Sequence, residues 1–163
     1  MPLRWIQTRH FPYHAVHPAG RGQDVLIGIG GNLGDVPARF ERLWRYWQRS
    51  GEVVIIQTSP ILRNPPFGYR DQPDFYNALI HLRTSLDPHM LLRYILYTEK
   101  RFGRTRSFAH APRTLDLDMI FYDDRTIRTS RLSLPHPHWR ERDSVVMPWR
   151  RMKGVTPWSK RHL

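Results

Sequence analysis

The sequence predicts an α+β fold, because strand-like and helix-like segments follow one another in the order β-α-β-β-α-β. That order is typical of a ferredoxin-like split βαββαβ arrangement, in which a mostly antiparallel sheet has helices packed on it. Two segments combine helix-capping residues with apolar stripes, and 40% hydrophobic and 12% aromatic residues are enough for a globular core. We therefore expect one sheet with its helices on one face.

The first predicted strand is the apolar run "VLIGIG" at residues 25–30, which is bounded by glycines. A helix should follow it, because Asp35 can cap the first turn, Pro37 suits that turn, and Gly51 can end the helix. Apolar residues recur in this helix at spacings of three or four and form one core-facing stripe: Val36, Phe40, Leu43, Trp44 and Trp47.

The second half of the predicted sheet begins with the β-branched segment 52–64, which is broken near Pro60. A turn-rich loop at residues 64–74 leads to an alternating strand at residues 75–82. A second helix should run from Asp87-Pro88 to about Phe102. Its inward positions are expected to be Leu91, Leu92, Ile95 and Leu96. The segment "APRTLDLDMIFYDD" (111–124) supplies the last strand, and the remaining tail is expected to hold two short helices.

The bulk properties limit the classes of protein to consider. With 163 residues the chain is expected to form a single domain over residues 25–163, after an N-terminal extension at residues 1–24. It contains no cysteine, no run of signal-peptide length and no apolar stretch of membrane-spanning length. We therefore expect a cytoplasmic protein with no disulfide, no thiolate metal site and no membrane partner.

A net charge of +12 points to an anionic partner, which could be nucleic acid, an acidic membrane surface or a small polyphosphate. Most of the cations are arginines, whose planar guanidinium groups suit phosphate recognition. A general basic bias of the proteome would give the same charge without any such partner. Charge alone leaves these alternatives open.

The glycine-rich segment "GIGGNLGD" (28–35) does not fit a nucleotide-binding loop. From Gly28 the third glycine of a dinucleotide fingerprint would fall on Leu33, and no Gly-Lys-Ser/Thr ending is present for a P-loop. We interpret the glycines as a tight strand-to-helix turn with close backbone packing.

Asp116 and Asp118 are the most informative pair. Alternation along a strand places both carboxylates on one face, while their apolar neighbours point to the other. Two carboxylates so close would repel one another unless a cation lay between them, and Mg²⁺ binds through one or two carboxylates together with substrate phosphates. From the pair alone, a metal site and a solvated strand end are about equally supported.

The arginines before this strand favour the metal site. Four of them lie within the 15 preceding residues: Arg101, Arg104, Arg106 and Arg113. Guanidinium groups and Mg²⁺ together offset the charge that develops during transfer of a phosphate group. A solvated basic loop would explain the charge but not the neighbouring aspartates.

Three other polar residues are candidates for binding. Asn77 offers donors and an acceptor to a flat heterocycle, although a hydrogen bond within the sheet would explain it equally well. Glu99 continues the inward face of the second helix, so it either lies near a site or pairs with an arginine. His136 could contact phosphate, whereas a zinc site there is not favoured because further ligands are lacking.

Four segments occur in an order and spacing that carry a resemblance: "GGNLGD", "PFGYRDQPDFYNA", "APRTLDLDMIFYDD" and "LSLPHPHWRERDSVVMP". From about Val25 to Met152 the chain resembles 6-hydroxymethyl-7,8-dihydropterin pyrophosphokinase, a family of folate biosynthesis. The resemblance implies a ferredoxin-like fold and transfer of pyrophosphate from ATP to the pterin hydroxymethyl group, with release of AMP. It implies two Mg²⁺ ions bound with ATP, and we expect a monomer.

The resemblance also assigns roles to residues. Asp116 and Asp118 would hold both Mg²⁺ ions, and Arg104 and Arg113 would stabilise charge during transfer. Residues expected to contact the nucleotide are Glu99, Arg106, Arg113, Met119, Arg131, Ser133, His136 and Arg142. Residues expected to form the pterin pocket are Asn64, Pro65, Phe67, Phe75 and Asn77.

The chain departs from the family pattern at several positions. In the loop before Pro112 a family arginine and tryptophan have no clear counterpart, and Phe108 or His110 could replace them. Ser144 stands where relatives have a pterin-stacking phenylalanine, which would leave stacking to Phe75. Leu96 stands where some relatives carry glutamine, and the compact family members have no counterpart of the N-terminal extension.

The alternative function is a nucleic-acid-binding module, because ferredoxin-like sheets can bind RNA through exposed aromatic residues. No aromatic run of that kind lies on the predicted strands, and the last strand carries the two aspartates. We therefore expect small-molecule substrates and no nucleic-acid partner.

Overall fold

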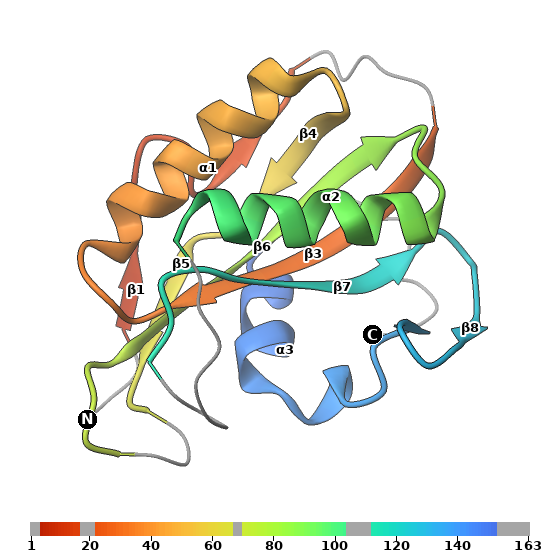
Figure 1. Cartoon of the computed structure of the whole chain (residues 1–163). Helices are drawn as coiled ribbons and strands as arrows, with labels where there is room; N and C mark the ends of the chain where they lie inside the picture. Colours follow the sequence, from red (N-terminus) through yellow and green to blue (C-terminus); the bar gives the residue numbers. More distant parts are fainter. Residues whose placement is uncertain (1–3, 17–21, 67–69, 104–111, 153–163) are drawn as a thin grey trace.

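The computed structural model describes residues 4–16, 22–66, 70–103 and 112–152 of the chain (Figure 1). Within these residues the protein is α+β, with a seven-stranded sheet, a two-stranded sheet and three α-helices. The coarse prediction of an α+β fold with helices packed on a mostly antiparallel sheet is therefore confirmed.

Both long helices begin at the predicted caps. The Asp35 side chain accepts a hydrogen bond from the backbone N–H of Ala38 at 3.1 Å at the start of α1 (Val36–Ser50). Asp87 accepts one from Met90 at 2.9 Å at the start of α2 (Pro88–Arg101). Each cap stabilises its helix by about 1 kcal/mol.

Strand β3 (Gln23–Gly31) lies between β6 (Phe75–Thr84) and β7 (Asp116–Tyr122) in the sheet. The other edge of β6 pairs with β5 (Ile61–Asn64) near its start and with β4 (Val53–Thr58) near its end. All these pairings are antiparallel. The order across the sheet is therefore β4 and β5, then β6, β3 and β7.

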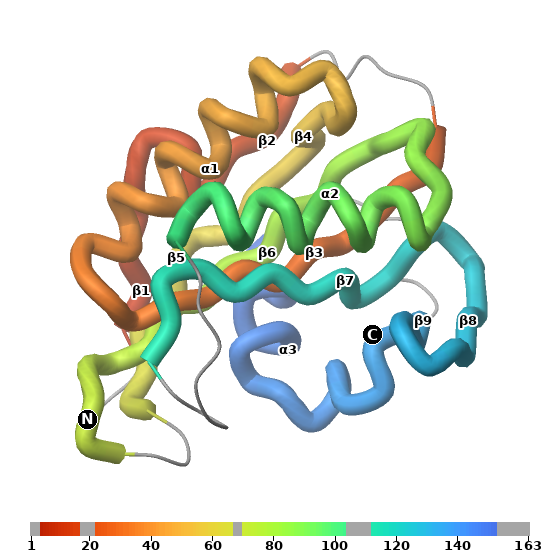
Figure 2. The backbone as a smooth tube through the Cα atoms, viewed as in Figure 1, coloured from red at the N-terminus to blue at the C-terminus, as the bar shows by residue number. Residues whose placement is uncertain are grey.

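The N-terminal segment adds two strands to this sheet, which the sequence did not predict. Strand β1 (Arg4–Ile6) pairs with β5, and β2 (Tyr13–His14) pairs with β4 (Figure 2). Between them Phe11 is fully buried in the main core. The described part of the predicted extension is thus packed onto the domain.

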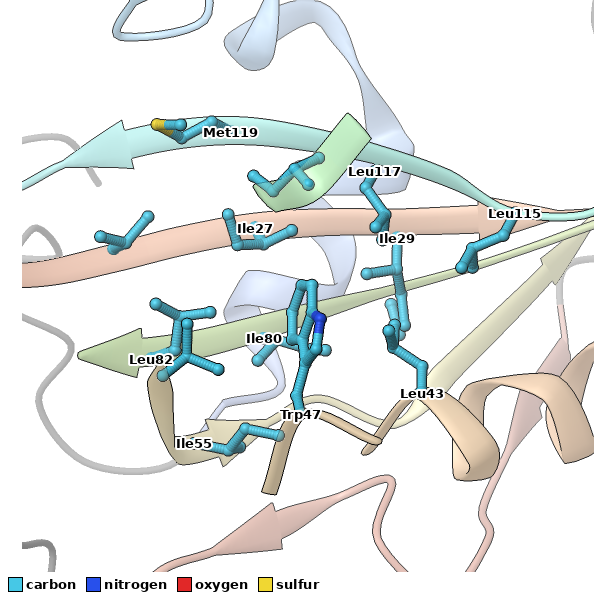
Figure 3. Close-up of a cluster of buried hydrophobic side chains, with 14 of the residues drawn as sticks. Ile27, Ile29, Leu43, Trp47, Ile55, Ile80, Leu82, Leu115, Leu117 and Met119 are labelled. Atoms are coloured by element: carbon cyan, nitrogen blue, oxygen red, sulfur yellow. The ribbon is translucent and has the colours of Figure 1, made fainter. Parts of the chain in front are cut away.

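The main core lies between the sheet and the helices α1 and α2 (Figure 3). Trp47 of α1 is fully buried there, and its indole N–H donates to Thr98 Oγ1 of α2 at 3.2 Å. Leu117 and Met119 point into the same core from β7, as the alternation of that strand predicts. Each large apolar side chain buried in this way contributes about 1.5–3 kcal/mol.

The opposite face of the sheet is covered in part by the C-terminal segment. After a small sheet of β8 (Ile127–Arg128) and β9 (Ser133–Leu134), the chain forms the short 3₁₀ helix η1 (Trp139–Glu141) and α3 (Asp143–Arg150). A second core cluster joins these elements to the sheet: Leu26, Leu79, Ile120, Phe121, Trp139, Val145 and Trp149. The two predicted short helices are therefore present. They pack on the face opposite α1 and α2, so the expectation that the helices share one face of the sheet is wrong.

The prediction is wrong for one residue that was expected in the core. Leu96 of α2 is 42% exposed, although the helical spacing predicted that it faces inward. The buried positions of α2 are Pro88, Leu91, Ile95, Thr98 and Glu99, so Leu96 lies beside the stripe that contacts the sheet. None of the helices in the described residues is long and apolar enough to cross a membrane.

Candidate functional site

The two aspartates lie on the sheet face opposite α1 and α2. Asp116 begins β7 and Asp118 follows two residues later, while Leu117 between them points into the main core. The side chains of Asp116 and Asp118 are 21% and 43% exposed. The strand therefore presents two carboxylates side by side to an open face, as the sequence predicted.

An arginine accompanies each carboxylate. Arg113 Nη1 lies 2.9 Å from Asp116 Oδ2, and Arg142 Nη1 lies 3.8 Å from Asp118 Oδ2. Arg113 precedes β7 and Arg142 precedes α3, so two segments distant in sequence meet here. Guanidinium groups beside carboxylates suit a ligand that brings both anionic oxygens and hard cations.

Asn32 connects the glycine-rich segment to this arginine, and the sequence analysis missed it. Its side chain is 2% exposed, and its Oδ1 accepts the backbone N–H of Arg113 at 2.8 Å. Its amide donates to Gln72 Oε1 at 2.8 Å and to the Pro73 carbonyl at 3.0 Å. One buried carboxamide thus holds three segments together. An asparagine next to a glycine turn was the only signal for it.

The glycine-rich segment has the packing role predicted for it. A Cβ atom on Gly31 would lie 2.6 Å from the carbonyl oxygen of Thr114, so only glycine allows this approach. Gly34 has a φ of +73°, which favours glycine at the turn into α1. Arg39 of α1 donates to the carbonyls of Leu33 and Thr114 at 2.5 and 2.8 Å.

Asn77 and Asn64 form a second polar group on the same face. The Asn77 amide donates to Asn64 Oδ1 at 3.0 Å, and Phe75 is paired with Asn64 in the register of β5 and β6. Across the sheet Asn77 is paired with Gly30, which is paired in turn with Asp116. Neighbouring strands lie about 4.8 Å apart, so Asn77 and Asp116 are about 10 Å apart across the strands.

His136 lies at the other end of the aspartate strand. Its backbone N–H donates to the Ile120 carbonyl at 2.9 Å, and its Nδ1 accepts the backbone N–H of His138 at 3.2 Å. Burial lowers the pKa of His136 to about 4, with Arg142 and His138 acting in the same direction and Asp116 against them. The imidazole is therefore neutral near pH 7, with its proton on Nε2.

An open pocket of about 310 Å³ lies beside His136. It is lined by Arg128, Pro135, His136, Pro137, Trp139, Arg140 and Glu141. The cations of this lining suit an anionic ligand, and the proline and tryptophan rings suit a flat one.

Two of the expected nucleotide-contacting residues have buried side chains. Glu99 is 4% exposed, and its Oε2 accepts the backbone N–H of Leu117 at 2.7 Å, which links α2 to β7. The Met119 side chain is 6% exposed and belongs to the main core. At Met119 a contact with a ligand on the open face would have to come from the backbone.

The remaining predicted residues are spread around the same face or lie outside the described part. Arg131 is exposed and Ser133 half-buried at the β8–β9 hairpin, and Ser144 is half-buried in the first turn of α3. Pro65 is exposed just after β5. Five predicted residues lie outside the described residues: Phe67, Arg104, Arg106, Phe108 and His110.

Within the described residues no group of three or more histidine, cysteine, aspartate or glutamate side chains could hold a metal ion. The pair Asp116 and Asp118 still fits Mg²⁺, because that ion typically takes only one or two protein carboxylates and fills its shell with water and phosphate oxygens. A zinc site made of protein ligands alone does not fit these residues.

The fold and the site define a small α+β protein whose open sheet face combines paired carboxylates, arginines and two hydrogen-bonded asparagines. The family model described as 7,8-dihydro-6-hydroxymethylpterin-pyrophosphokinase (HPPK) matches residues 26–154. The chain belongs to this family.

Individual relatives agree with the assignment. The chain is 44% identical over 145 residues to a 2-amino-4-hydroxy-6-hydroxymethyldihydropteridine pyrophosphokinase of Helicobacter pylori, covering 88% of this chain and 89% of the relative. It is 37% identical over 142 residues to the protein of the same name from Campylobacter jejuni, covering 87% and 90%. A relative of that name from Bacillus subtilis is 34% identical over 124 residues, covering 76% and 74%.

Proposed function

We propose that the protein is a pyrophosphokinase that transfers the pyrophosphoryl group of ATP to the hydroxymethyl group of 6-hydroxymethyl-7,8-dihydropterin. The family assignment supports this activity, a step of folate biosynthesis, over the nucleic-acid-binding alternative. The structural observation that carries it is the pairing of Asp116 and Asp118 with arginines on the face that also presents Asn77. Charged groups that would bind a polyphosphate and polar groups that would bind a heterocycle thus share one surface.

In the proposed reaction the hydroxyl oxygen of the pterin attacks the β-phosphorus of ATP. The bond from that phosphorus to the α,β-bridging oxygen breaks, AMP leaves, and the hydroxyl proton passes to solvent. Arg113 would offset the negative charge that develops on the transferred group, together with Arg104, which lies outside the described residues. Positioning of both substrates supplies much of the rate enhancement.

Asp116 and Asp118 would hold two Mg²⁺ ions that enter with ATP. Bound there, the ions would supply charge neutralisation for the phosphate oxygens. Arg113 and Arg142 lie against these carboxylates in the structure and are therefore placed to turn toward phosphate oxygens when cations occupy the aspartates.

The nucleotide would extend from the aspartates toward the pocket beside His136. The neutral imidazole can donate from Nε2 to a phosphate oxygen, and Arg142 adds positive charge nearby. The exposed Arg131 would contribute a further charge from the β8–β9 hairpin. Ser133 and the backbone of Met119 would border this region, and Arg106 would join it from the loop that precedes Pro112. The buried Glu99 side chain would act indirectly, through its hydrogen bond to the Leu117 backbone of β7.

The pterin would lie over the other end of the face. Asn77 and Asn64 offer the donors and acceptors that the edge of a pterin requires, and Phe75 would stack on its ring. Pro65 and Phe67 would complete the pocket. Ser144 contributes no ring, so Phe75 would stack alone.

The strand order of β4 and β5, β6, β3 and β7 supports a ferredoxin-like split arrangement. Residues 25–163 would form a single pyrophosphokinase domain that follows an N-terminal extension at residues 1–24. We expect a monomer in the cytoplasm, with no nucleic-acid partner. Size-exclusion chromatography with light scattering tests the monomer.

One assay tests the function. The protein is incubated with ATP, Mg²⁺ and 6-hydroxymethyl-7,8-dihydropterin, and the nucleotide products are separated. AMP that forms only when the pterin is present supports the proposal. Formation of ADP, or no turnover, contradicts it.

A further inference from the structure

Gly30 lies between the asparagines and the aspartates of the candidate site. It lies on the central strand β3, paired with Asn77 on one side and with Asp116 on the other. Paired residues of antiparallel strands share a face, so Gly30 lies between the proposed pterin pocket and the proposed metal site. It is the position in the sheet where these two regions meet.

The backbone conformation does not require glycine at this position. The φ of Gly30 lies outside the left-handed region, unlike the φ values of Gly34 and Gly51. Its place within a regular strand would normally favour a residue with a side chain, because glycine weakens strands. We therefore attribute the glycine to a lack of room for a side chain at this position.

The Asn77 side chain occupies that space. A Cβ atom on Gly30 would lie 2.6 Å from Asn77 Oδ1 and 3.5 Å from the Tyr76 carbonyl oxygen. The first distance is far below van der Waals contact, and the second is an ordinary contact. The Asn77 carboxamide would therefore have to move. Its amide group donates to Asn64 Oδ1 at 3.0 Å in the present structure.

Gly28 provides a comparison on the same strand and face. A Cβ atom there would meet Ile120 Cδ1 at 3.5 Å, which is ordinary contact. Gly28 also lies within β3, with Leu79 and Asp118 as its paired residues. An alanine at residue 28 therefore fits, whereas an alanine at residue 30 must displace Asn77.

We propose that Gly30 is a positioning residue for the pterin substrate, because its missing side chain lets the Asn77 carboxamide lie close to the central strand and bond to Asn64. This inference rests on the proposed function. Gly30 does not act on the reacting atoms, and its effect is transmitted through Asn77.

The first test compares Gly30→Ala with Gly28→Ala in steady-state kinetics. We expect Gly30→Ala to raise KM for the pterin by roughly 10- to 100-fold, as a displacement of about 1 Å at a binding group can do, while KM for ATP changes less than about twofold. Gly28→Ala should leave both values near those of the wild type. Equal pterin KM values for the two variants would overturn the inference.

A double-mutant cycle tests whether the effect passes through Asn77. In an Asn77→Ala background the clashing Oδ1 is absent, so Gly30→Ala should then change pterin KM less than about twofold. The same loss in both backgrounds would show that Gly30 acts by another route. If Gly30→Ala alone fails to fold, the double variant should recover folding, and its failure to do so would also overturn the inference.

A measurement without substrates separates this inference from the proposed function. In ¹⁵N-edited NMR spectra the Asn77 side-chain amide signals are identified by their loss in Asn77→Ala. Gly30→Ala should shift these signals and Gly28→Ala should not. A wild-type protein that makes no AMP would refute the function, while unshifted amide signals in Gly30→Ala would refute the positioning role alone.

Discussion

The Oδ1 atom of Asn32 accepts the backbone N–H of Arg113 at 2.8 Å, and the Asn32 backbone N–H donates to the Arg113 carbonyl at 2.9 Å. These two hydrogen bonds fix the turn after β3 against the segment that leads into β7. The Asn32 amide also binds the loop that contains Gln72. The position of the arginine thus depends on a buried asparagine 81 residues away in the sequence.

We predict that Asn32→Ala lowers both stability and activity. The substitution leaves the part-buried backbone N–H of Arg113 without its acceptor, and an unsatisfied group of this kind costs up to about 1–3 kcal/mol. It also releases Arg113, so kcat should fall by roughly tenfold or more, because misplacing a charge-stabilising group weakens transition-state stabilisation. Urea unfolding and AMP formation measure the two effects.

Gln72→Ala is the matched control for this prediction. It removes the amide contact to residue 72 and keeps the Asn32 hydrogen bond to Arg113, so kcat should change much less than in Asn32→Ala. Wild-type kinetics for Asn32→Ala would contradict the role of Asn32.

Asp118→Asn should nearly abolish the Mg²⁺-dependent transfer. The change keeps the size of the side chain but removes the charge that we propose holds Mg²⁺, and loss of one such electrostatic group costs on the order of 10²–10³ in rate. Asp124→Asn is the control, because it removes the same charge from an exposed position after β7. Rates measured over a range of Mg²⁺ concentrations and circular dichroism spectra check the activity and the fold. Normal turnover by a folded Asp118→Asn would refute the metal assignment.

The helices and the strands of the central sheet were predictable because their signals are local. Asp35 and Asp87 mark the two helix starts, and the predicted break at Pro60 separates β4 from β5. The alternation that placed Asp116 and Asp118 on one face is a property of any strand. These features need no knowledge of distant contacts.

The features that sequence reasoning missed depend on partners far along the chain. Strand β1 has only three residues and β2 only two, and both are defined by pairing with β5 and β4. The role of Asn32 depends on contacts 40 to 81 residues away. The exposure of Leu96 depends on how α2 is rotated on the sheet. Periodicity and composition contain no information of this kind.

Phe11→Ala should destabilise the protein strongly, because the N-terminal segment is part of the core. Phe11 is fully buried and packs against Phe40 with a ring-centroid distance of 5.8 Å. Truncating a buried phenylalanine to alanine costs about 3–5 kcal/mol. Val16→Ala is the control, since Val16 is 84% exposed. Guanidinium unfolding of both variants gives the comparison, and equal midpoints would show that the segment is not anchored as described.

The same segment should lose one stabilising contribution in acid. Burial raises the pKa of Glu41, but hydrogen bonds from Thr8 and His10 outweigh this effect, so the pKa lies below its ordinary value of 4.5. A carboxyl group with a lowered pKa stabilises the folded protein above pH 4.5, and this contribution is lost as the pH falls through the folded-state pKa. Glu41→Gln should therefore lower the free energy of unfolding at pH 7 and have a smaller effect near pH 3. An effect of equal size at both pH values would contradict the ionic origin.

His136 should remain neutral well below pH 6.5. Its pKa is lowered to about 4, first by burial and then by Arg142 and His138. The unfolded chain binds the proton more tightly, so the free energy of unfolding should fall as the pH decreases from about 6.5 to about 4 and become independent of this group below that. NMR titration of the imidazole, with the His136 signal identified by its loss in His136→Gln, should give a midpoint near 4, and the same variant should reduce the slope of stability against pH in this window. A midpoint at or above 6.5 would show that the ring is not buried beside Arg142.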